Sequence, residues 1–288
     1  MSAVIVSFSG GLGNQLFQYA AGMELSRRLN VPLFAETEFY KTSPNRRFVL
    51  DFFDLEYDGL SGFSMYRRMS LSKYYWLDLI SKGNQLLRCP FLFNEAHFEF
   101  DPRIMNLTAP VYLKGYWQSE KYFPAVANEL KNRVQLQLPE SMVQICGQID
   151  DRAVCLHLRR GDFINNPEIA RIIGVCSIDY YRQAVKAMNE MIGSPRFFIF
   201  TDEPSAVDSI ADLIQEPVIV NRFSNGDDLA EFALMQRFGN FIIANSTFSW
   251  WAAWSSLKDE KRVICPVKWF SDLSINTKDL CPPDWVKY

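Results

Sequence analysis

The feature that most constrains the fold is the regular alternation of short apolar segments with helical segments in the second half of the chain. Runs rich in β-branched and aromatic residues predict strands, and stretches with apolar residues at helical spacing separate them. Strands joined by helices pair in parallel, so the pattern predicts a parallel sheet covered by helices on both faces. The predicted strands are 153–158, 196–200, 218–220, 241–244 and 262–265, and the predicted helices are 178–191, 205–214, 227–238 and 248–256.

The first half begins with the same kind of pattern. An apolar strand predicted at 3–8 is followed by a glycine-rich turn, a helix up to residue 30 and a second strand at 31–34, which is the start of a βαβ unit. Further along, the pattern predicts a helix at 66–87, a strand at 111–116 and a helix at 120–134, and the polar stretch 139–151 reads as a linker. We therefore expect two α/β domains, 1–150 with insertions and 151–288.

Composition excludes several classes of protein. The chain has 30 basic and 33 acidic residues and no basic stripe, which argues against a nucleic-acid partner. No apolar run approaches the roughly 20 residues that span a bilayer, and no signal peptide is evident, so we expect a cytoplasmic protein. With two histidines and no CxxC pair, a His-rich or Cys-rich metal site is not expected.

A glycine-rich turn, Ser9-Gly10-Gly11-Leu12-Gly13-Asn14-Gln15, follows the first predicted strand. Backbone N–H groups in such a turn can approach an anion or a sugar hydroxyl. The turn lacks the Lys-Ser/Thr pair of a Walker loop, and Leu16 occupies the place of the third glycine in the dinucleotide fingerprint. Glu36 or Glu38 could still be a ribose-binding acid, which leaves an NAD(P)-dependent oxidoreductase as one alternative. A turn without any ligand is the other.

Two adjacent arginines leave the strand predicted at 153–158, in the segment His157-Leu158-Arg159-Arg160-Gly161-Asp162. Successive side chains point to opposite faces of a strand, so only one of these arginines is expected to face a ligand. The planar, permanently charged guanidinium fits phosphate oxygens. Asp162 could hold the other arginine in an ion pair, and a wholly structural Arg–Asp network is the alternative.

Polar residues follow two more predicted strands. Asn245-Ser246-Thr247-Phe248 opens a helix, where hydroxyl and N–H groups can bind a phosphate or simply cap the helix. Asp202 ends another strand, and its carboxylate could accept two hydrogen bonds from guanine or cap the next helix. Trp250 and Trp254 are expected in the core rather than stacked on a sugar. The aromatic content of 15% nevertheless leaves a non-catalytic sugar-binding protein as an alternative.

Taken together, four motifs resemble the bacterial α-1,2-fucosyltransferases, glycosyltransferase family 11. Residues 10–20 resemble the opening of that family, and Tyr116–Phe123 resemble its mid-chain block. His157–Asp162 match the HxRRxD pattern shared with α-1,6- and protein O-fucosyltransferases, and Asn245–Trp254 match NSxFSWWAAW. The motifs occur in the order of the family and cover nearly the whole chain.

The resemblance implies a GT-B-like fold, with two Rossmann-like domains facing each other across a nucleotide-sugar cleft. GDP-fucose would be bound mainly by the C-terminal domain, 151–288, and the N-terminal domain, 1–150, would form the acceptor side. It implies inverting transfer of L-fucose from GDP-β-L-fucose to O2 of a terminal galactose, forming an α-1,2 linkage without a metal or other cofactor. The acceptor would be a galactose-terminated oligosaccharide or a lipid-linked glycan such as an O-antigen intermediate, which would bring the enzyme to the inner face of the membrane. Because the chain begins almost at its first strand, we expect no anchor like that of the animal relatives.

The resemblance also implies roles for individual residues. Arg159 should contact the β-phosphate and the glycosidic oxygen, His157 should orient Arg159 or meet the ribose, and Asn14 should lie near the phosphates and the sugar; these three are the expected catalytic residues. Asp202 should read guanine. The base that takes the acceptor proton stays open among Asp162, Glu36, Glu38 and His157, and the leaving phosphate or a water could take this proton instead. The implied GDP-fucose-binding residues are Gly11, Gly13, Asn14, His157, Arg159, Asp202, Ser246, Thr247 and Phe248, with Arg160 and Asp162 in support.

Overall fold

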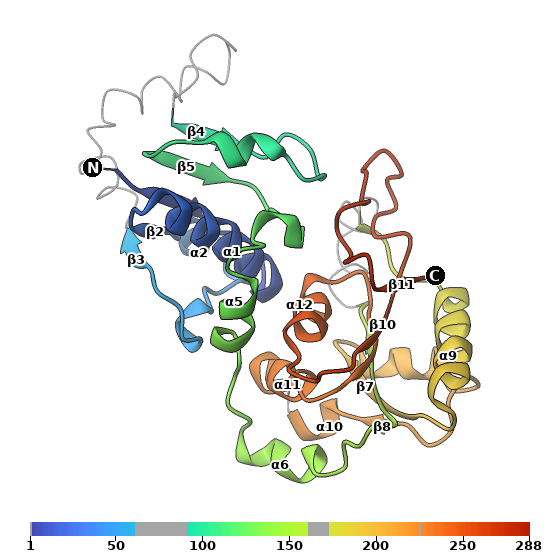
Figure 1. The fold of residues 1–288 in the computed structure, drawn as a ribbon. Coiled ribbons are helices and arrows are strands. Elements are labelled where there is room, and N and C mark those ends of the chain that lie inside the picture. The colour runs from blue at the N-terminus through green and yellow to red at the C-terminus, as the bar shows by residue number, and fades with distance from the viewer. Residues whose placement is uncertain (1, 61–90, 161–172, 225) are drawn as a thin grey trace. The chain divides into compact units, whose positions relative to one another are not determined.

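A computed structural model of the chain describes residues 2–60, 91–160, 173–224 and 226–288. The chain divides into two compact α/β units, Met1–Leu130 and Lys131–Tyr288. Each unit is built on a parallel sheet, as the sequence predicts (Figure 1). The helix predicted at 66–87 lies outside the described residues.

In the first unit, five parallel strands form a sheet in the order β3-β2-β1-β5-β4. The central strand β1 is buried and pairs Val4 with Leu33 of β2 and with Val111 of β5. Its strands are β1 (Val4–Ser7), β2 (Leu33–Glu36), β3 (Asp58–Leu60), β4 (Leu92–Asn94) and β5 (Val111–Lys114), and its helices are α1 (Leu12–Leu29), α2 (Glu38–Thr42), the 3-10 turns η1 (Leu50–Phe52), η2 (Pro102–Asn106) and η3 (Glu120–Tyr122), and the first part of α5 (Ala127–Arg133).

The long helix α1 packs directly on β1. A side chain at Gly22 would not fit, because its Cβ would lie 2.5 Å from a methyl of Val6 and 2.9 Å from a methyl of Leu33. The helix ends at Leu29, and the next residue, Asn30, adopts a left-handed conformation with φ of 52°. Arg27 and Arg28 in the last turn suit the negative end of the helix dipole.

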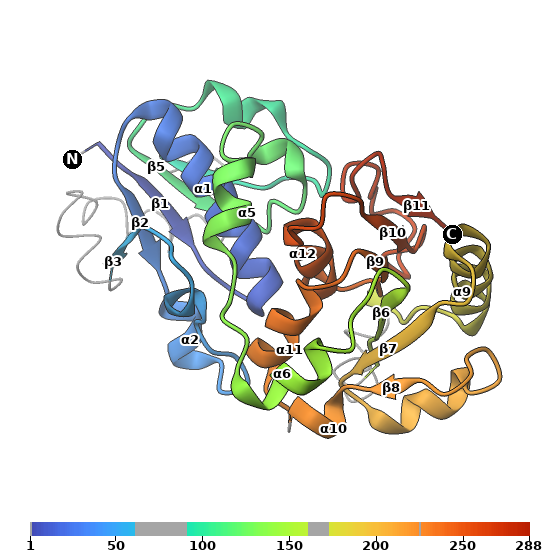
Figure 2. The same ribbon diagram turned by 60° about the horizontal axis from the view of Figure 1, so that its bottom comes forward.

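The second unit contains six parallel strands in the order β11-β10-β9-β6-β7-β8. Helix α9 covers one face of this sheet, and α11 and α12 cover the other (Figure 2). The strands are β6 (Ala153–Leu158), β7 (Arg196–Thr201), β8 (Val218–Ile219), β9 (Asn240–Ile242), β10 (Arg262–Cys265) and β11 (Val286–Lys287), and the helices are α6 (Glu140–Cys146), α9 (Ile178–Ile192), the 3-10 helix η4 (Pro204–Ile210), α10 (Asn221–Ser224), α11 (Asp228–Met235) and α12 (Thr247–Ser255).

The division between the units falls at Leu130, earlier than the predicted boundary after residue 150. Residues 131–136 belong to the second unit because they are hydrogen-bonded to it. The side-chain amide of Gln236 donates to the carbonyl of Val134 at 2.9 Å, and the N–H of Leu136 donates to Oε1 of Gln236 at 3.2 Å. The predicted linker 139–151 is also partly helical, since it contains α6.

Two predicted helices differ from the structure. The helix expected at 120–134 is split into η3 and α5, and Pro124 lies in the break, where it cannot donate the hydrogen bond that a continuous helix needs. The helix expected at 205–214 is the 3-10 helix η4, which begins at Pro204. The other predicted helices and strands of the second half are confirmed within a few residues at each end.

Candidate functional site

The sequence motifs of the second unit meet at one edge of its sheet. Strand β6 lies between β9 and β7, and all three are parallel. The residues after their carboxyl ends therefore lie at the same edge, which is where ligands bind in parallel α/β sheets. This edge carries His157 and Arg159 from β6, Asp202 from β7 and the start of α12 after β9.

Arg159 and Asp202 form an ion pair at this edge. The guanidinium Nε of Arg159 lies 3.0 Å from Oδ2 of Asp202, and the two side chains are each 23% exposed. The backbone N–H of Arg160 donates to Oδ1 of Asp202 at 2.9 Å. Asp202 thus fixes the orientation of the Arg159 guanidinium, a role that the sequence did not predict.

The other predicted roles of these residues stay predictions. Asp202 could recognise guanine only through a carboxylate that is already engaged, because one oxygen pairs with Arg159 and the other accepts from the N–H of Arg160. The supporting pair of Arg160 with Asp162 was expected from their closeness in sequence. Asp162 lies outside the described residues, so this pair is not seen.

His157 is buried beneath Arg159, with only 4% of its surface exposed. Burial and the nearby positive charge of Arg159 together lower the pKa of its imidazole to about 3, although Asp202 acts in the opposite direction. The ring is therefore neutral near pH 7. Within the described part of the chain its Nδ1 has no hydrogen-bond partner, and its ring centre lies 6.0 Å from that of Phe248.

The start of α12 offers the positive end of a helix dipole at the same edge. Ser246 occupies the N-cap position, and its side chain makes no capping hydrogen bond. The N–H of Trp250 donates to the carbonyl of Ser246, so the N–H groups of Thr247 and Phe248 precede the first bond inside the helix. Such an N-terminus favours anions.

Asn245 holds this helix start in place. It is buried, and its side-chain amide donates to the carbonyls of Ile173, Gly174 and Trp269 at 3.0–3.2 Å, while its oxygen accepts from the thiol of Cys176. The polar residue that the sequence placed at a helix cap is therefore an anchor between three segments of the second unit.

The tryptophans of α12 belong to the core, which confirms the prediction. Trp250 and Trp251 have no exposed surface and Trp254 is 5% exposed. The rings of Trp250 and Trp254 are stacked with centres 5.9 Å apart, and Nε1 of Trp250 donates to the carbonyl of Leu280. These rings are not available for stacking on a sugar.

In the first unit, the glycine-rich turn also lies at the carboxyl edge of its sheet. Gly10 has a φ of 79°, which favours glycine, and Gly11 is the N-cap of α1, with Gly13 buried in its first turn. Oδ1 of Asn14 accepts a hydrogen bond of 2.9 Å from the side-chain amide of Gln118. The turn and the mid-chain motif that includes Gln118 are therefore joined.

Two buried glutamines tie the same turn to its surroundings. Gln15 donates to the carbonyls of Gly10 and Arg47 and accepts from the N–H of Val49. Gln18 accepts from the N–H of Ser9 and donates to the carbonyl of Gly115. The Gln-rich part of the motif is structural, because it fixes the glycine turn relative to β5.

The acids proposed for a ribose are engaged elsewhere. Glu36 is 6% exposed and accepts from the hydroxyls of Ser7 and Tyr112 and from the N–H of Glu38. The carboxylate of Glu38 pairs with Lys41 at 2.7 Å. This arrangement disfavours the NAD(P) alternative, which needs one of these carboxylates for the ribose hydroxyls.

One acid that the sequence analysis missed lies at the edge of the first sheet. Glu95 follows β4, and its carboxylate accepts hydrogen bonds from the N–H groups of Tyr116 at 2.6 Å and Trp117 at 3.0 Å. Burial raises its pKa to about 7, although the two N–H groups act in the opposite direction. The available signal was a glutamate directly after a short apolar segment, Phe91-Leu92-Phe93-Asn94.

Two kinds of feature are absent from the described residues. No group of three or more His, Cys, Asp or Glu side chains is placed to hold a metal ion. No helix in this part of the chain has the length and apolar character needed to cross a membrane.

Comparisons with known proteins identify sequences similar to most of this chain. The sequence profile of glycosyltransferase family 11 matches residues 92–288, which is more than half of the chain. Two Escherichia coli relatives are each 29% identical: an alpha-1,2-colitosyltransferase (100% of this chain, 99% of the relative) and the O-antigen biosynthesis glycosyltransferase WbnK (96% and 98%). A putative galactoside 2-alpha-L-fucosyltransferase of Caenorhabditis elegans is 25% identical over 96% of this chain and 76% of its own length.

A solved structure also resembles the fold. A mutant of Arabidopsis thaliana FUT1 in complex with GDP superposes with a TM-score of 0.50 at 12% identity, covering 92% of this chain and 70% of that chain. Together with the two parallel sheets, this similarity supports the expected GT-B-like class, built from two Rossmann-like domains.

Proposed function

Since this chain belongs to glycosyltransferase family 11, we propose that it transfers L-fucose from GDP-β-L-fucose to O2 of a terminal galactose, with inversion to an α-1,2 linkage. The observation that carries the proposal is the cationic edge of the second unit. There the Arg159 guanidinium, held by Asp202, lies at the same sheet edge as the start of α12. Both kinds of group can stabilise a departing diphosphate.

The chemistry explains why such an edge is useful. Cleavage of the fucose–phosphate bond leaves growing negative charge on the β-phosphate, and fixed donors stabilise that charge most when they need no reorganisation. A charge-assisted bond from Arg159 contributes roughly 1.5–3 kcal/mol, and the dipole of α12 adds about 0.3–1 kcal/mol. We infer that these groups replace a divalent cation and that no cofactor is required.

His157 supports this site in its neutral form. A protonated imidazole beneath Arg159 would add a buried positive charge, which both burial and Arg159 disfavour. The neutral ring instead offers nitrogen atoms as hydrogen-bond partners, and we propose that it meets the ribose or orients Arg159. Asn14 and the turn at Gly11 and Gly13 are proposed to contact the phosphates and the fucose.

We propose that the first unit binds the acceptor, and the names of two relatives indicate the chemical class of that acceptor. We propose a galactose-terminated oligosaccharide or lipid-linked glycan of the O-antigen type as acceptor, since one relative is named for O-antigen biosynthesis and another as a putative galactoside 2-alpha-L-fucosyltransferase. A lipid-linked acceptor would bring the enzyme to the membrane surface.

A second candidate donor is GDP-colitose. This donor is supported by the alpha-1,2-colitosyltransferase of Escherichia coli, which is 29% identical over the whole of this chain. Colitose is L-fucose without its 3-hydroxyl. A site that hydrogen-bonds this hydroxyl would reject colitose strongly, whereas an apolar pocket there would accept both sugars.

The test is a transfer assay with both donors and a panel of β-galactosides in the presence of EDTA, followed by linkage analysis by NMR. We expect α-1,2-fucosylated product, at a rate unchanged by EDTA. A 2-deoxygalactoside is the matched control, because it lacks only the attacking hydroxyl, and it should give no product. A different linkage, transfer to the 2-deoxygalactoside or complete loss of activity in EDTA would contradict the proposal.

A further inference from the structure

We propose that the Glu95 carboxylate is the base that accepts the proton of the attacking acceptor hydroxyl. The inference rests on the proposed function, because it concerns the same transfer. In this step the acceptor oxygen bonds to the anomeric carbon of the sugar, and the bond from that carbon to the β-phosphate oxygen breaks. The electron pair leaves with GDP, and the hydroxyl proton passes to Glu95, which later releases it to water.

Glu95 lies at the carboxyl ends of the parallel strands of the first unit, which is where ligands bind in such sheets. It directly follows β4, whose neighbour β5 lies between β4 and β1. The carboxyl ends of these three parallel strands carry Glu95, the segment Gly115–Trp117 and the glycine-rich turn. Gln118 donates to Asn14, so the segment after β5 is bonded to the proposed binding turn. Glu95 therefore shares its edge with residues proposed to contact the sugar.

The backbone after β5 is shaped around this carboxylate. The N–H groups of Tyr116 and Trp117 donate to Oε2 and Oε1 of Glu95 respectively, which fixes the orientation of both oxygens. Trp117 has a φ of 56°, a left-handed conformation that is costly for a large residue. Gly115 cannot carry a side chain, because its Cβ would lie 2.4 Å from Cβ of Glu95. Strain of this kind is common at functional sites.

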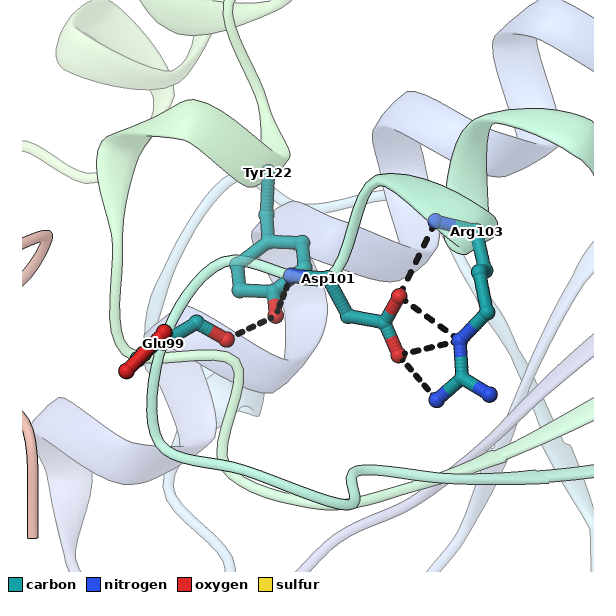
Figure 3. Close-up of polar contacts among 4 residues, drawn as sticks. All are labelled: Glu99, Asp101, Arg103 and Tyr122. Carbon is teal, nitrogen blue, oxygen red and sulfur yellow. Dashed lines mark hydrogen bonds and ion pairs between the residues drawn. The ribbon is translucent and has the colours of Figure 1, made fainter.

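Burial is the main cause of the raised pKa of Glu95, and the negative charge of Asp101 adds to it. The cation of the same loop, Arg103, is paired with Asp101 through contacts of 2.6 and 2.9 Å, and Figure 3 shows the guanidinium facing that carboxylate. His97 also acts on Asp101 and is exposed. Within the described residues no cation pairs with Glu95.

The loop that carries these groups is anchored. The hydroxyl of Tyr122 accepts from the N–H of Asp101 at 2.8 Å and donates to the carbonyl of Glu99 at 3.2 Å (Figure 3). Tyr122 belongs to the mid-chain motif, as do Tyr116 and Trp117. That motif therefore holds both the carboxylate and the loop that follows it, which gives the base a fixed position.

The other candidate bases fit less well. Glu36 is only 6% exposed and accepts three hydrogen bonds, whereas Glu95 is half-buried and accepts two. Glu38 is paired with Lys41. His157 is a poor proton acceptor, because burial lowers its pKa to about 3. Asp162 lies outside the described residues. A carboxyl group whose pKa is close to the working pH is the more efficient base.

The experiment compares Glu95→Gln and Glu95→Asp with the wild type, and uses Glu99→Gln as a control in the same loop. The assay measures kcat and KM for transfer between about pH 5.5 and 8.5, together with GDP affinity by calorimetry. We expect Glu95→Gln to lower kcat by about 10²–10⁴-fold while GDP affinity stays within about threefold. The wild-type decline in rate below about pH 7 should be absent from the residual activity of this variant.

Glu95→Asp keeps a carboxylate and should recover part of the rate with the acidic decline retained. It also serves if Glu95→Gln does not fold, because a shorter carboxylate should shift the midpoint of that decline. The proposal is overturned if Glu95→Gln transfers at close to the wild-type rate, if its acidic decline is unchanged, or if Glu95→Asp leaves the midpoint in place. Absence of transfer by the wild type itself would instead overturn the proposed function.

Discussion

Replacement of Arg159 by alanine tests whether this residue acts in catalysis or only stabilises the fold. The substitution removes the guanidinium and leaves Asp202 without that partner, while Asp202 still accepts from the N–H of Arg160. Since both side chains are 23% exposed, water can partly replace the lost ion pair. We expect a loss of about 1–2 kcal/mol in the free energy of unfolding, which corresponds to roughly 2–8 °C in Tm.

The effect on catalysis should be larger. Loss of one fixed donor to a developing anion lowers the rate by about 10²–10³-fold, or roughly 3–4 kcal/mol in activation free energy. The assay is initial-rate transfer from the sugar nucleotide, with thermal unfolding of the same preparations. Arg196→Ala is the matched control, because Arg196 pairs with Asp150 at 3.8 Å from the opposite end of β7. Arg196→Ala should keep activity within about threefold of wild type, and the reasoning is refuted if Arg159→Ala does so too.

Three further predictions concern stability. Asn245→Ala removes several buried hydrogen bonds and should lower the free energy of unfolding by about 2–4 kcal/mol in urea titrations, so a loss below 1 kcal/mol would contradict its anchoring role. Gly22→Ala should cost roughly 1–3 kcal/mol because the new methyl meets Val6, whereas Gly59→Ala, which meets nothing within 4 Å, should cost less, and the reverse order would refute the packing argument. Burial raises the pKa of Glu231 from 4.5 to about 7 in the folded state. Between these two pH values the unfolded chain loses this proton more readily than the folded chain, so the free energy of unfolding falls as pH rises. Glu231→Gln should therefore be more stable than wild type at about pH 8 by roughly 1–2 kcal/mol, with a smaller difference at pH 5, and an equal difference at both would be inconsistent with this titration.

The parts of the fold that follow from local pattern could be predicted from the sequence. The apolar strands of the second unit and the helices between them have strong periodicity, and their parallel pairing follows from the alternation. The strand-end positions of His157, Arg159 and Asp202 were predicted for the same reason. Local breaks such as the one at Pro124 were missed because the apolar spacing continues across them.

Partners that depend on register between distant strands could not be predicted. The ion pair of Arg159 with Asp202 could not be predicted, because it depends on the pairing of β6 with β7, in which Leu158 lies opposite Thr201. Glu95 follows a strand of only three residues, which has too little pattern to be recognised. Two backbone N–H groups about twenty residues further along the chain donate to the Glu95 carboxylate. No local sequence pattern predicts this contact.

The proposed function requires that Arg159 and the start of α12 hold the departing diphosphate, and a crystal structure of the complex with GDP would show whether they do. We predict a β-phosphate oxygen about 2.7–3.1 Å from the Arg159 guanidinium and from an N–H of the first turn of α12. A diphosphate that is remote from both groups, or is held by a magnesium ion, would contradict the claim.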